Sequence, residues 1–397
     1  MMDLPRFAVV MAATLLVAGT GAPAAWAQAP WKVGEVRPYL AETPHPYPAG
    51  AKDRPVVWAD RVVSPGATFI RVHLSGLSLA RGDYLTISDP DRTRVQTYMG
   101  EGPHRNGDLW SFSIDGDTAL VEIHAAGREI GHGYRIDAVG HGTARIEPVP
   151  EVVCGSNGLE DVACHMKDKA FAAAQRPVAR LLFASGGFLF LCTGWLADGA
   201  NASTLVTNNH CISKQSEADS LEALFNFQVT KCGGTTPAPT MAYAGGTILK
   251  TNNIQTRGKK DGLDYTLLAL DGNPELTWGK IVPSRRPLAV GDPIWFIQHP
   301  GGEPKQVGFW EDAEQTVRCQ IDAVDQSLRG VAHGSQAFYA CDSAGGSSGS
   351  PIIDPATGHA IALHHFGGVA TNPCLNGATE MAPICDDAGP LLNCAAD

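Results

Sequence analysis

The sequence predicts a loop-rich all-β protein with more than one domain. Its 397 residues exceed what a single core of ordinary size needs, which indicates two or three domains. It contains 44 glycines and 27 prolines, and only 18% of its residues are charged. Its apolar residues fall in short runs that alternate with polar ones and end at turn residues. Alternation with a period of two is typical of antiparallel strands.

Residues 1–27 are predicted to be a signal peptide. An apolar run over residues 7–21 leads to the small-residue site Ala25-Trp26-Ala27, so we expect cleavage before Gln28. A membrane anchor needs about 20 apolar residues, and this run is shorter. No later segment of the sequence is apolar enough to span a bilayer. The sequence therefore predicts a secreted or periplasmic protein without stable membrane insertion.

Residues 28–150 are predicted to form a small β-sandwich domain. The proline-rich stretch "TPHPYPAGAKDRP" is followed by alternating runs such as "TFIRVHLSGLSL" and "LWSFSIDGDTALVEIHAAG". This part contains no catalytic constellation, which favours a folding or inhibitory prosegment or an accessory module. Because no cysteine lies between residues 28 and 153, we place a boundary near 150 and a second domain at 151–397.

The cysteines indicate a disulfide-bonded protein. An even number of cysteines in an exported chain favours disulfides. The sequence has no C-x-x-C pair of the kind that would suggest a zinc site. No P-loop or G-x-G-x-x-G motif predicts a nucleotide, and the net charge of −11 argues against a nucleic-acid partner. We therefore expect no cofactor and no metal. The ten cysteines are Cys154, Cys164, Cys192, Cys211, Cys232, Cys319, Cys341, Cys374, Cys385 and Cys394.

Three segments of the second domain carry candidate catalytic residues. They are "TLVTNNHC" with His210, "GLDYTLLAL" with Asp264 and "GGSSGSP" with Ser348. A serine hydroxyl becomes a nucleophile when an imidazole removes its proton, and a carboxylate fixes the imidazole's tautomer. Each residue alone is more often structural, as a buried histidine, a turn aspartate or a loop serine. The order His, Asp, Ser differs from the orders in subtilisins and α/β-hydrolases.

The stretches "CTGWLADGANASTLVTNNHC", "LDYTLLAL" and "GGSSGSPI" resemble trypsin-like serine endopeptidases, most closely the bacterial lysyl endopeptidase branch. The resemblance covers residues 154–374. It implies a chymotrypsin-like fold, with two six-stranded antiparallel β-barrels and the site in the cleft between them. By the same resemblance His210 is the general base, Asp264 orients it and Ser348 is the nucleophile.

The glycine-rich turn is explained by the same resemblance. Backbone N–H groups of Gly346 and Ser348 would stabilise the oxyanion, and large side chains there would block the substrate carbonyl. One residue departs from the digestive enzymes: Ser347 stands where they carry the aspartate that captures a new N-terminal amine. Activation must therefore differ. The resemblance also implies the disulfides Cys154–Cys374, Cys164–Cys232 and Cys192–Cys211, and it leaves Cys319–Cys341 and Cys385–Cys394 as the remaining pairs.

The residues suggest a basic specificity but leave an alternative open. Asp342 lies six residues before Ser348, the trypsin spacing for the acid that binds Lys or Arg, although Asp342 could instead cap the turn with Ser343. His365 lies where glutamyl endopeptidases carry a histidine that binds an acidic side chain. Gly367 and its neighbour are expected to pair with an extended substrate strand.

The sequence thus predicts a monomeric secreted serine endopeptidase that cuts proteins or peptides after Lys or Arg. The alternatives are the same fold with Glu or Asp specificity, an esterase of small substrates, and a non-catalytic binding protein on a protease scaffold.

Overall fold

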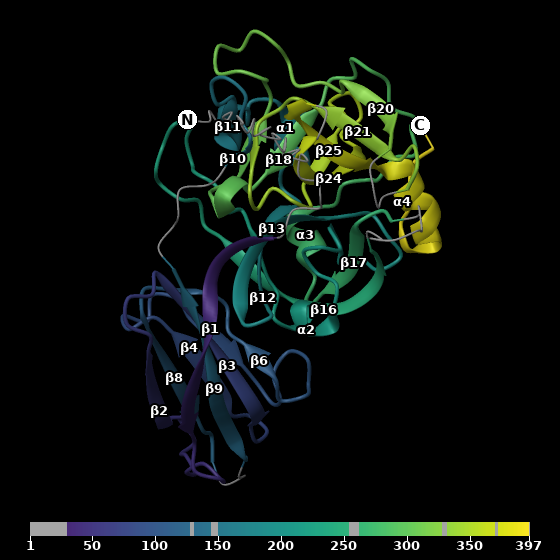
Figure 1. Ribbon diagram of the computed structural model, residues 1–397. Coiled ribbons are helices and arrows are strands. Elements are labelled where there is room, and N and C mark those ends of the chain that lie inside the picture. Colours follow the sequence, from purple (N-terminus) through teal and green to yellow (C-terminus); the bar gives the residue numbers. More distant parts are fainter. Residues whose placement is uncertain are drawn as a thin grey trace, which may run out of the picture.

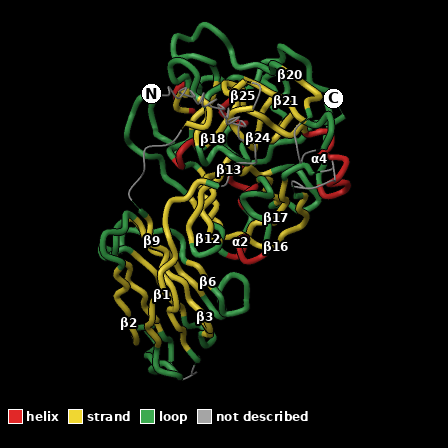
Figure 2. Tube along the Cα trace, viewed as in Figure 1, coloured by secondary structure: helices red, strands yellow, loops and turns green. Residues whose placement is uncertain are grey.

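The computed structural model describes residues 30–127, 131–143, 150–253, 262–327, 332–369 and 372–396. The predicted signal peptide and its cleavage site lie outside these residues. The protein is mostly β, with a sandwich at one end and two further β layers above it (Figures 1 and 2). No helix of the described part is both long and apolar enough to cross a membrane.

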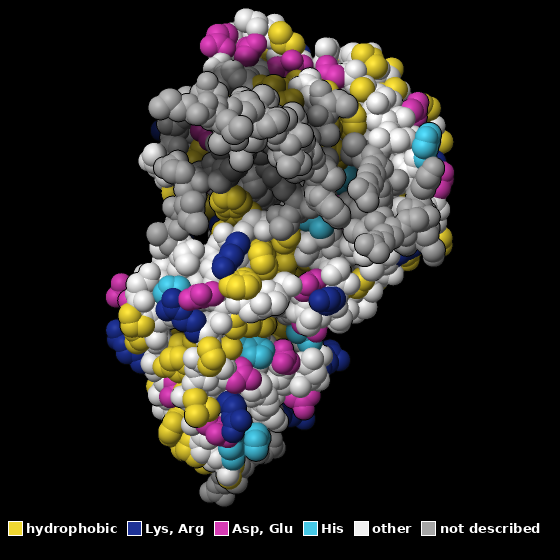
Figure 3. All heavy atoms as spheres, viewed as in Figure 1, with side chains coloured by type: hydrophobic (Ala, Val, Ile, Leu, Met, Phe, Trp, Pro, Cys, Tyr) yellow, Lys and Arg dark blue, Asp and Glu magenta, His cyan; other side chains and the backbone are white. Residues whose placement is uncertain are grey.

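The N-terminal domain is a sandwich of two antiparallel sheets around one apolar core. One sheet contains β2 (Val56–Val63), β8 (Thr118–His124), β4 (Tyr84–Ser88) and β5 (Val95–Tyr98). The other contains β1 (Trp31–Glu42), β9 (Gly133–Gly142), β3 (Phe69–Ser78), β6 (Leu109–Trp110) and β7 (Ile114–Asp115). On the face in Figure 3, basic and acidic side chains of this domain are interspersed rather than gathered in one basic patch.

Strand β3 shows how alternation connects this domain to the next. Ile70, Val72 and Leu74 are fully buried in the sandwich core, as a period of two predicts. Arg71 points to the opposite face, yet it is also fully buried. Its guanidinium donates to the carbonyl of Ser220 at 2.8 Å, in the next domain. The outer face of this sheet is therefore packed against the next domain.

The first barrel is a closed, six-stranded antiparallel barrel. Its strands follow the order β12-β15-β16-β17-β14-β13, and β13 pairs back with β12. Strand β13 also pairs with β1, so the sandwich sheet continues into the barrel. The strands are β12 (Val178–Ser185), β13 (Phe188–Leu196), β14 (Thr204–Thr207), β15 (Glu222–Phe225), β16 (Met241–Asn252) and β17 (Tyr265–Leu270).

The sheet that we call the second barrel has eight antiparallel strands in the order β11-β19-β18-β23-β24-β25-β21-β20, around its own apolar core; among the described residues its end strands β11 and β20 do not pair with each other. The strands are β11 (Leu159–Asp161), β18 (Trp295–Gln298), β19 (Gln306–Gly308), β20 (Ala323–Gln326), β21 (Gln336–Tyr339), β23 (Pro351–Ile353), β24 (Ala360–Val369) and β25 (Asn372–Glu380). A separate pair joins β10 (Pro150–Val152) to β22 (Ser343–Ala344). The predicted chymotrypsin-like all-β fold is confirmed, with two strands more than expected in this sheet.

Helices are few and short. Asp168 caps α1 by accepting from two backbone N–H groups. The helices are α1 (Lys169–Ala174), α2 (Gln215–Asp219), α3 (Pro274–Trp278), α4 (Met381–Ala388), η1 (Val162–Cys164), η2 (Pro300–Gly302) and η3 (Gly389–Leu391). The disulfides Cys154–Cys374, Cys164–Cys232 and Cys192–Cys211 are those that the resemblance implies, and Cys319–Cys341 and Cys385–Cys394 are the two pairs that remained.

Candidate active site

His210 and Asp264 meet at one end of the first barrel. Asp264 directly precedes β17, and His210 follows β14, the strand that pairs with β17. Asp264 accepts two hydrogen bonds from His210, one from the backbone N–H at 2.9 Å and one from Nδ1 at 2.7 Å. The carboxylate therefore fixes both the position of the imidazole and the nitrogen that carries its proton.

The surroundings of Asp264 keep its carboxyl group ionised. Burial alone would raise its pKa, but the charge and hydrogen bond of His210, together with the hydrogen bond of His365, hold this pKa below its ordinary value. The backbone of Asp264 has a φ of 48°, a left-handed conformation that is uncommon for a residue other than glycine. Its own carbonyl accepts from the Asn208 side chain at 2.9 Å. Strained backbone held by such contacts is concentrated at functional sites.

The turn that carries Ser348 is fixed through its carbonyl groups. The carbonyl of Gly345 accepts from Gly301 N–H at 2.6 Å, and the carbonyl of Ser347 accepts from Ser350 N–H at 3.0 Å. In a trans peptide the N–H points opposite to the carbonyl. The N–H groups of Gly346 and Ser348 therefore point away from these anchors. Within the described residues, neither N–H donates a hydrogen bond.

Thr193 of β13 holds the other two carbonyl groups of this turn. Its backbone N–H donates to Ser348 at 2.8 Å, and its hydroxyl donates to Gly346 at 2.9 Å. Gly346 has a φ of 98°, and a Cβ there would lie 3.1 Å from the carbonyl oxygen of His299. Glycine is thus required for the conformation and for the space. Contacts with Thr193 and His299 thus fix the conformation of the turn.

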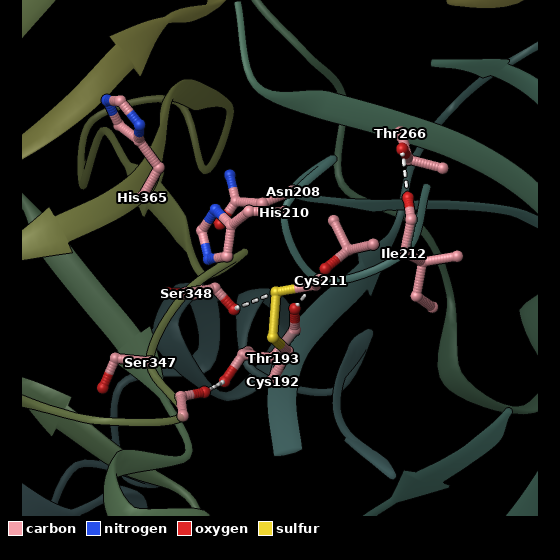
Figure 4. The surroundings of a disulfide bond; sticks show 12 residues. Cys192, Thr193, Asn208, His210, Cys211, Ile212, Thr266, Ser347, Ser348 and His365 are labelled. Atoms are coloured by element: carbon pink, nitrogen blue, oxygen red, sulfur yellow. Dashed lines mark hydrogen bonds between the residues drawn. A yellow bond between two sulfur atoms is a disulfide. The ribbon is translucent and has the colours of Figure 1, made fainter. Parts of the chain in front are cut away.

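The second nitrogen of His210 is left for a reacting partner. His210 Nε2 is buried and makes no hydrogen bond within the described part of the chain, including none to Ser348. Ser348 lies next to the Cys192–Cys211 disulfide, with its carbonyl 4.0 Å from Cys211 Sγ. Figure 4 shows His210 above this disulfide, between Ser348 and His365. Catalytic hydrogen bonds are often formed only when a substrate is bound.

Asp342 lies in a different environment from Asp264. It is also fully buried, but its Oδ2 accepts from the backbone N–H of Gly158 at 2.5 Å, while its Oδ1 has no partner among the described residues. Burial raises the pKa of Asp342 to about 6, although the N–H groups of Gly158 and Cys154 lower it. A buried oxygen without a partner is costly, and a cation placed beside it would remove this cost.

His365 is buried against Asp264 and Gln336. Its Nδ1 lies 3.2 Å from Asp264 Oδ2, its Nε2 lies 2.6 Å from Gln336 Oε1, and the side chain is 1% exposed. Both nitrogens are thus occupied inside the protein. The neighbouring His364 faces the other way, with Nδ1 2.6 Å from the hydroxyl of Tyr339. Strand β24 therefore turns the His365 ring toward Asp264, and this orientation does not favour the predicted contact with a substrate side chain.

Ser343 and Gly367 lie on either side of a buried asparagine that the sequence did not single out. The Ser343 hydroxyl donates to Asn376 Oδ1 at 2.7 Å, and Gly367 pairs with Asn376 between β24 and β25. The hydroxyl of Ser343 is therefore bonded to Asn376. The other edge of β24 is hydrogen-bonded as far as His364, which exchanges backbone bonds with Ser350 and Gly349. Beyond His364, β24 pairs with β25 on one side, and no described strand pairs with its other edge. That edge remains available to an extended peptide.

Ser347 explains how the turn is held without the aspartate of the digestive enzymes. Its hydroxyl donates to Gln298 Oε1 at 2.5 Å, and the amide of Gln298 donates to the carbonyl of Asp342 at 2.9 Å. A neutral network of hydrogen bonds thus fixes this region. Cys192, His210 and Cys211 lie close together, but the two cysteines share a disulfide and offer no thiolate to a metal.

The family model for the lysyl endopeptidase C-terminal domain matches residues 156–380. The chain belongs to this family. Among solved structures, a Glu endopeptidase aligns with a TM-score of 0.41 and 17% identity, over 59% of this chain and 96% of that one.

Alignments with two curated relatives cover more of the chain than the family model does. Secreted RxLR effector protein 73 of Plasmopara viticola is 26% identical over 334 residues, which cover 81% of this chain and 79% of that protein. A lysyl endopeptidase of Pseudomonas aeruginosa is 26% identical over 300 residues, which cover 69% of this chain and 59% of the relative. The match thus spans less than two thirds of that lysyl endopeptidase.

Proposed function

We propose that the protein is a secreted serine endopeptidase that cuts after Lys or Arg. His210 removes the proton of Ser348, whose oxygen attacks the scissile carbonyl, and the same imidazole then protonates the leaving amine. Asp264 orients His210 and stabilises the imidazolium. The observation that carries this proposal is the pair of hydrogen bonds from His210 to Asp264, with Nε2 left unbonded beside the Ser348 turn.

The N–H groups of Gly346 and Ser348 form the oxyanion hole in this proposal. Two observations support this assignment. The carbonyl group of each of these two peptide groups already accepts a hydrogen bond, and neither N–H has an acceptor in the described chain. Donors fixed before the reaction need no reorganisation when the oxyanion forms. Removal of one such donor usually costs about 10²–10³ in rate.

Basic specificity rests on Asp342. The unpartnered Oδ1 would accept a substrate ammonium or guanidinium group, and the raised pKa of Asp342 would fall when that cation binds. The engagement of both histidines at 364 and 365 by protein groups argues against an acidic substrate side chain. We therefore retain Lys or Arg specificity and set aside Glu or Asp specificity.

Export and domain organisation complete the proposal. Five disulfides fit an oxidising compartment, and the P. viticola relative is named a secreted protein. We propose that residues 1–27 are removed and that residues 28–150 form a prosegment or accessory domain of the protease at 151–397. Because that relative is named an effector, a non-catalytic binding protein on the same scaffold is the second candidate.

A fluorophosphonate probe separates the two candidates. The probe phosphonylates only an activated serine, so we expect the wild-type protein to be labelled and Ser348→Ala to remain unlabelled while still folded. Ser203→Ala is the matched control, since Ser203 is a buried serine at the opposite end of β14 from His210. Absence of labelling in a folded wild-type protein would favour the binding role and overturn the protease proposal.

A further inference from the structure

The first strand of the N-terminal domain lies on the edge of the barrel next to Ser348. Strand β1 runs antiparallel to β13, with Trp31 opposite Leu191. Two residues farther along β13, Thr193 N–H donates to the Ser348 carbonyl. Two residues of a strand span about 7 Å. The N-terminal end of β1 therefore points along β13 toward the turn that carries Ser348.

Trp31 fills the space between this edge and the turn. A Cβ on Gly345 would collide with the indole ring of Trp31, so the ring lies directly against the Gly345 backbone. On its other side Trp31 packs on the buried side chains of Leu182, Leu189 and Leu191. Gly345 directly precedes Gly346, whose N–H belongs to the proposed oxyanion hole. An aromatic anchor thus lies against the residue next to Gly346.

A second strand from outside the family segment flanks the same turn. Strand β10 pairs with β22, which ends at Ala344, directly before Gly345. It also lies against β24 and β25. The family match begins at residue 156, so neither Trp31 nor β10 belongs to it. The turn is therefore enclosed by two strands that the matched protease domain does not include.

We propose that β1 is a built-in inhibitor that occupies the binding edge for the substrate residues that follow the scissile bond. This inference rests on the proposed protease function. A peptide with its scissile carbonyl at Gly346 and Ser348 must continue as an extended chain on both sides. The edge of β24 beyond His364, with which no described strand pairs, takes the residues before the bond. The edge of β13 is the counterpart for the residues after the bond, and Trp31 already pairs there.

The N-terminal domain is anchored so that β1 stays in place. The buried guanidinium of Arg71 donates to the carbonyl of Ser220, and the backbone N–H and hydroxyl of Ser113 donate to the carboxylate of Glu222. These contacts lie on the barrel away from the turn. Because they tether β1 at a high effective concentration, a substrate must displace Trp31 in an intramolecular competition.

Two substrates test this inference in the full-length protein. One is an internally quenched peptide with several residues on each side of a single Lys. The other is a lysyl amide with a fluorescent amine and no residues after the bond. We expect Trp31→Ala to raise kcat/KM for the long peptide about thirtyfold, the factor for loss of an aromatic anchor, and to leave the amide within about threefold. Trp58→Ala, on the outer sheet of the same domain, is the control and should change neither value.

Each outcome is decisive. Equal rates for Trp31→Ala and Trp58→Ala on the long peptide would overturn the inference, even if the fluorophosphonate probe labels Ser348 in both variants. Equal gains on the two substrates would also overturn it, because they would indicate general loosening rather than release of the leaving-side edge. If no variant is labelled or cleaves either substrate, the proposed function fails and this inference fails with it.

Discussion

Two buried aspartates, one at the end of the first barrel and one in the second, differ in every partner they have. Asp264 accepts two hydrogen bonds from His210 and lies next to His365, and its pKa is lowered. Asp342 accepts backbone N–H groups, keeps one unpartnered oxygen, and its pKa is raised to about 6. Although both carboxyl groups are fully buried, their pKa values are shifted in opposite directions. The first carboxylate suits the orientation of a base, and the second suits the binding of a cation from outside.

Replacement of Asp264 should have the largest effect of the two. We expect Asp264→Asn to lower kcat about 10⁴-fold on a Lys peptide, because the amide no longer fixes the tautomer of His210. KM should change little, since Asp264 touches no substrate. Steady-state kinetics on purified folded protein measure both values. A loss confined to KM would show that Asp264 binds substrate and would break the contrast with Asp342.

Replacement of Asp342 should have a smaller and more selective effect. We expect Asp342→Asn to lower kcat/KM for Lys and Arg peptides about 10²–10³-fold, the usual scale for loss of one partner of a buried ion pair. Labelling by a small fluorophosphonate should persist. The matched control is Asp322→Asn, since burial also raises the pKa of Asp322, which lies outside the proposed site. An unchanged preference for Lys and Arg would remove Asp342 from substrate binding.

The pH dependence of KM should give the smallest of these effects. Below about pH 6 the Asp342 carboxyl group is protonated and neutral, so it loses its attraction for a basic side chain. KM for a Lys peptide should therefore rise severalfold as the pH falls from 7 to 5. In Asp342→Asn the same KM should stay flat. A rise of equal size in the variant would assign the titration to another group.

The two aspartates also show what the sequence could and could not predict. The chain order, the flanking residues and the resemblance to trypsin-like proteases predicted that His210 lies near Asp264. In the structure the paired strands β14 and β17 bring both residues to the same end of a barrel. Strand alternation requires that the neighbours His364 and His365 face opposite sides of β24. It could not tell which side faces Asp264, since that depends on how β24 packs against the first barrel.

Contacts between residues far apart in the chain could not be predicted from the sequence. Gly158 donates to Asp342 across 184 positions of the chain, and Trp31 covers Gly345 across an even greater separation. Neither pairing leaves a motif, because backbone N–H groups and a strand edge accept many sequences. The role of Asn376 was missed for a related reason: a single buried asparagine in a strand has no distinctive spacing.

A map of cleavage sites tests the central claim most directly. A mixture of denatured proteins is digested with the full-length protein, and all released peptides are sequenced by mass spectrometry. The account predicts new C-termini that end almost entirely in Lys or Arg, and no such peptides with Ser348→Ala. Cleavage mainly after Glu or Asp, or the same peptides from the Ser348→Ala variant, would contradict it.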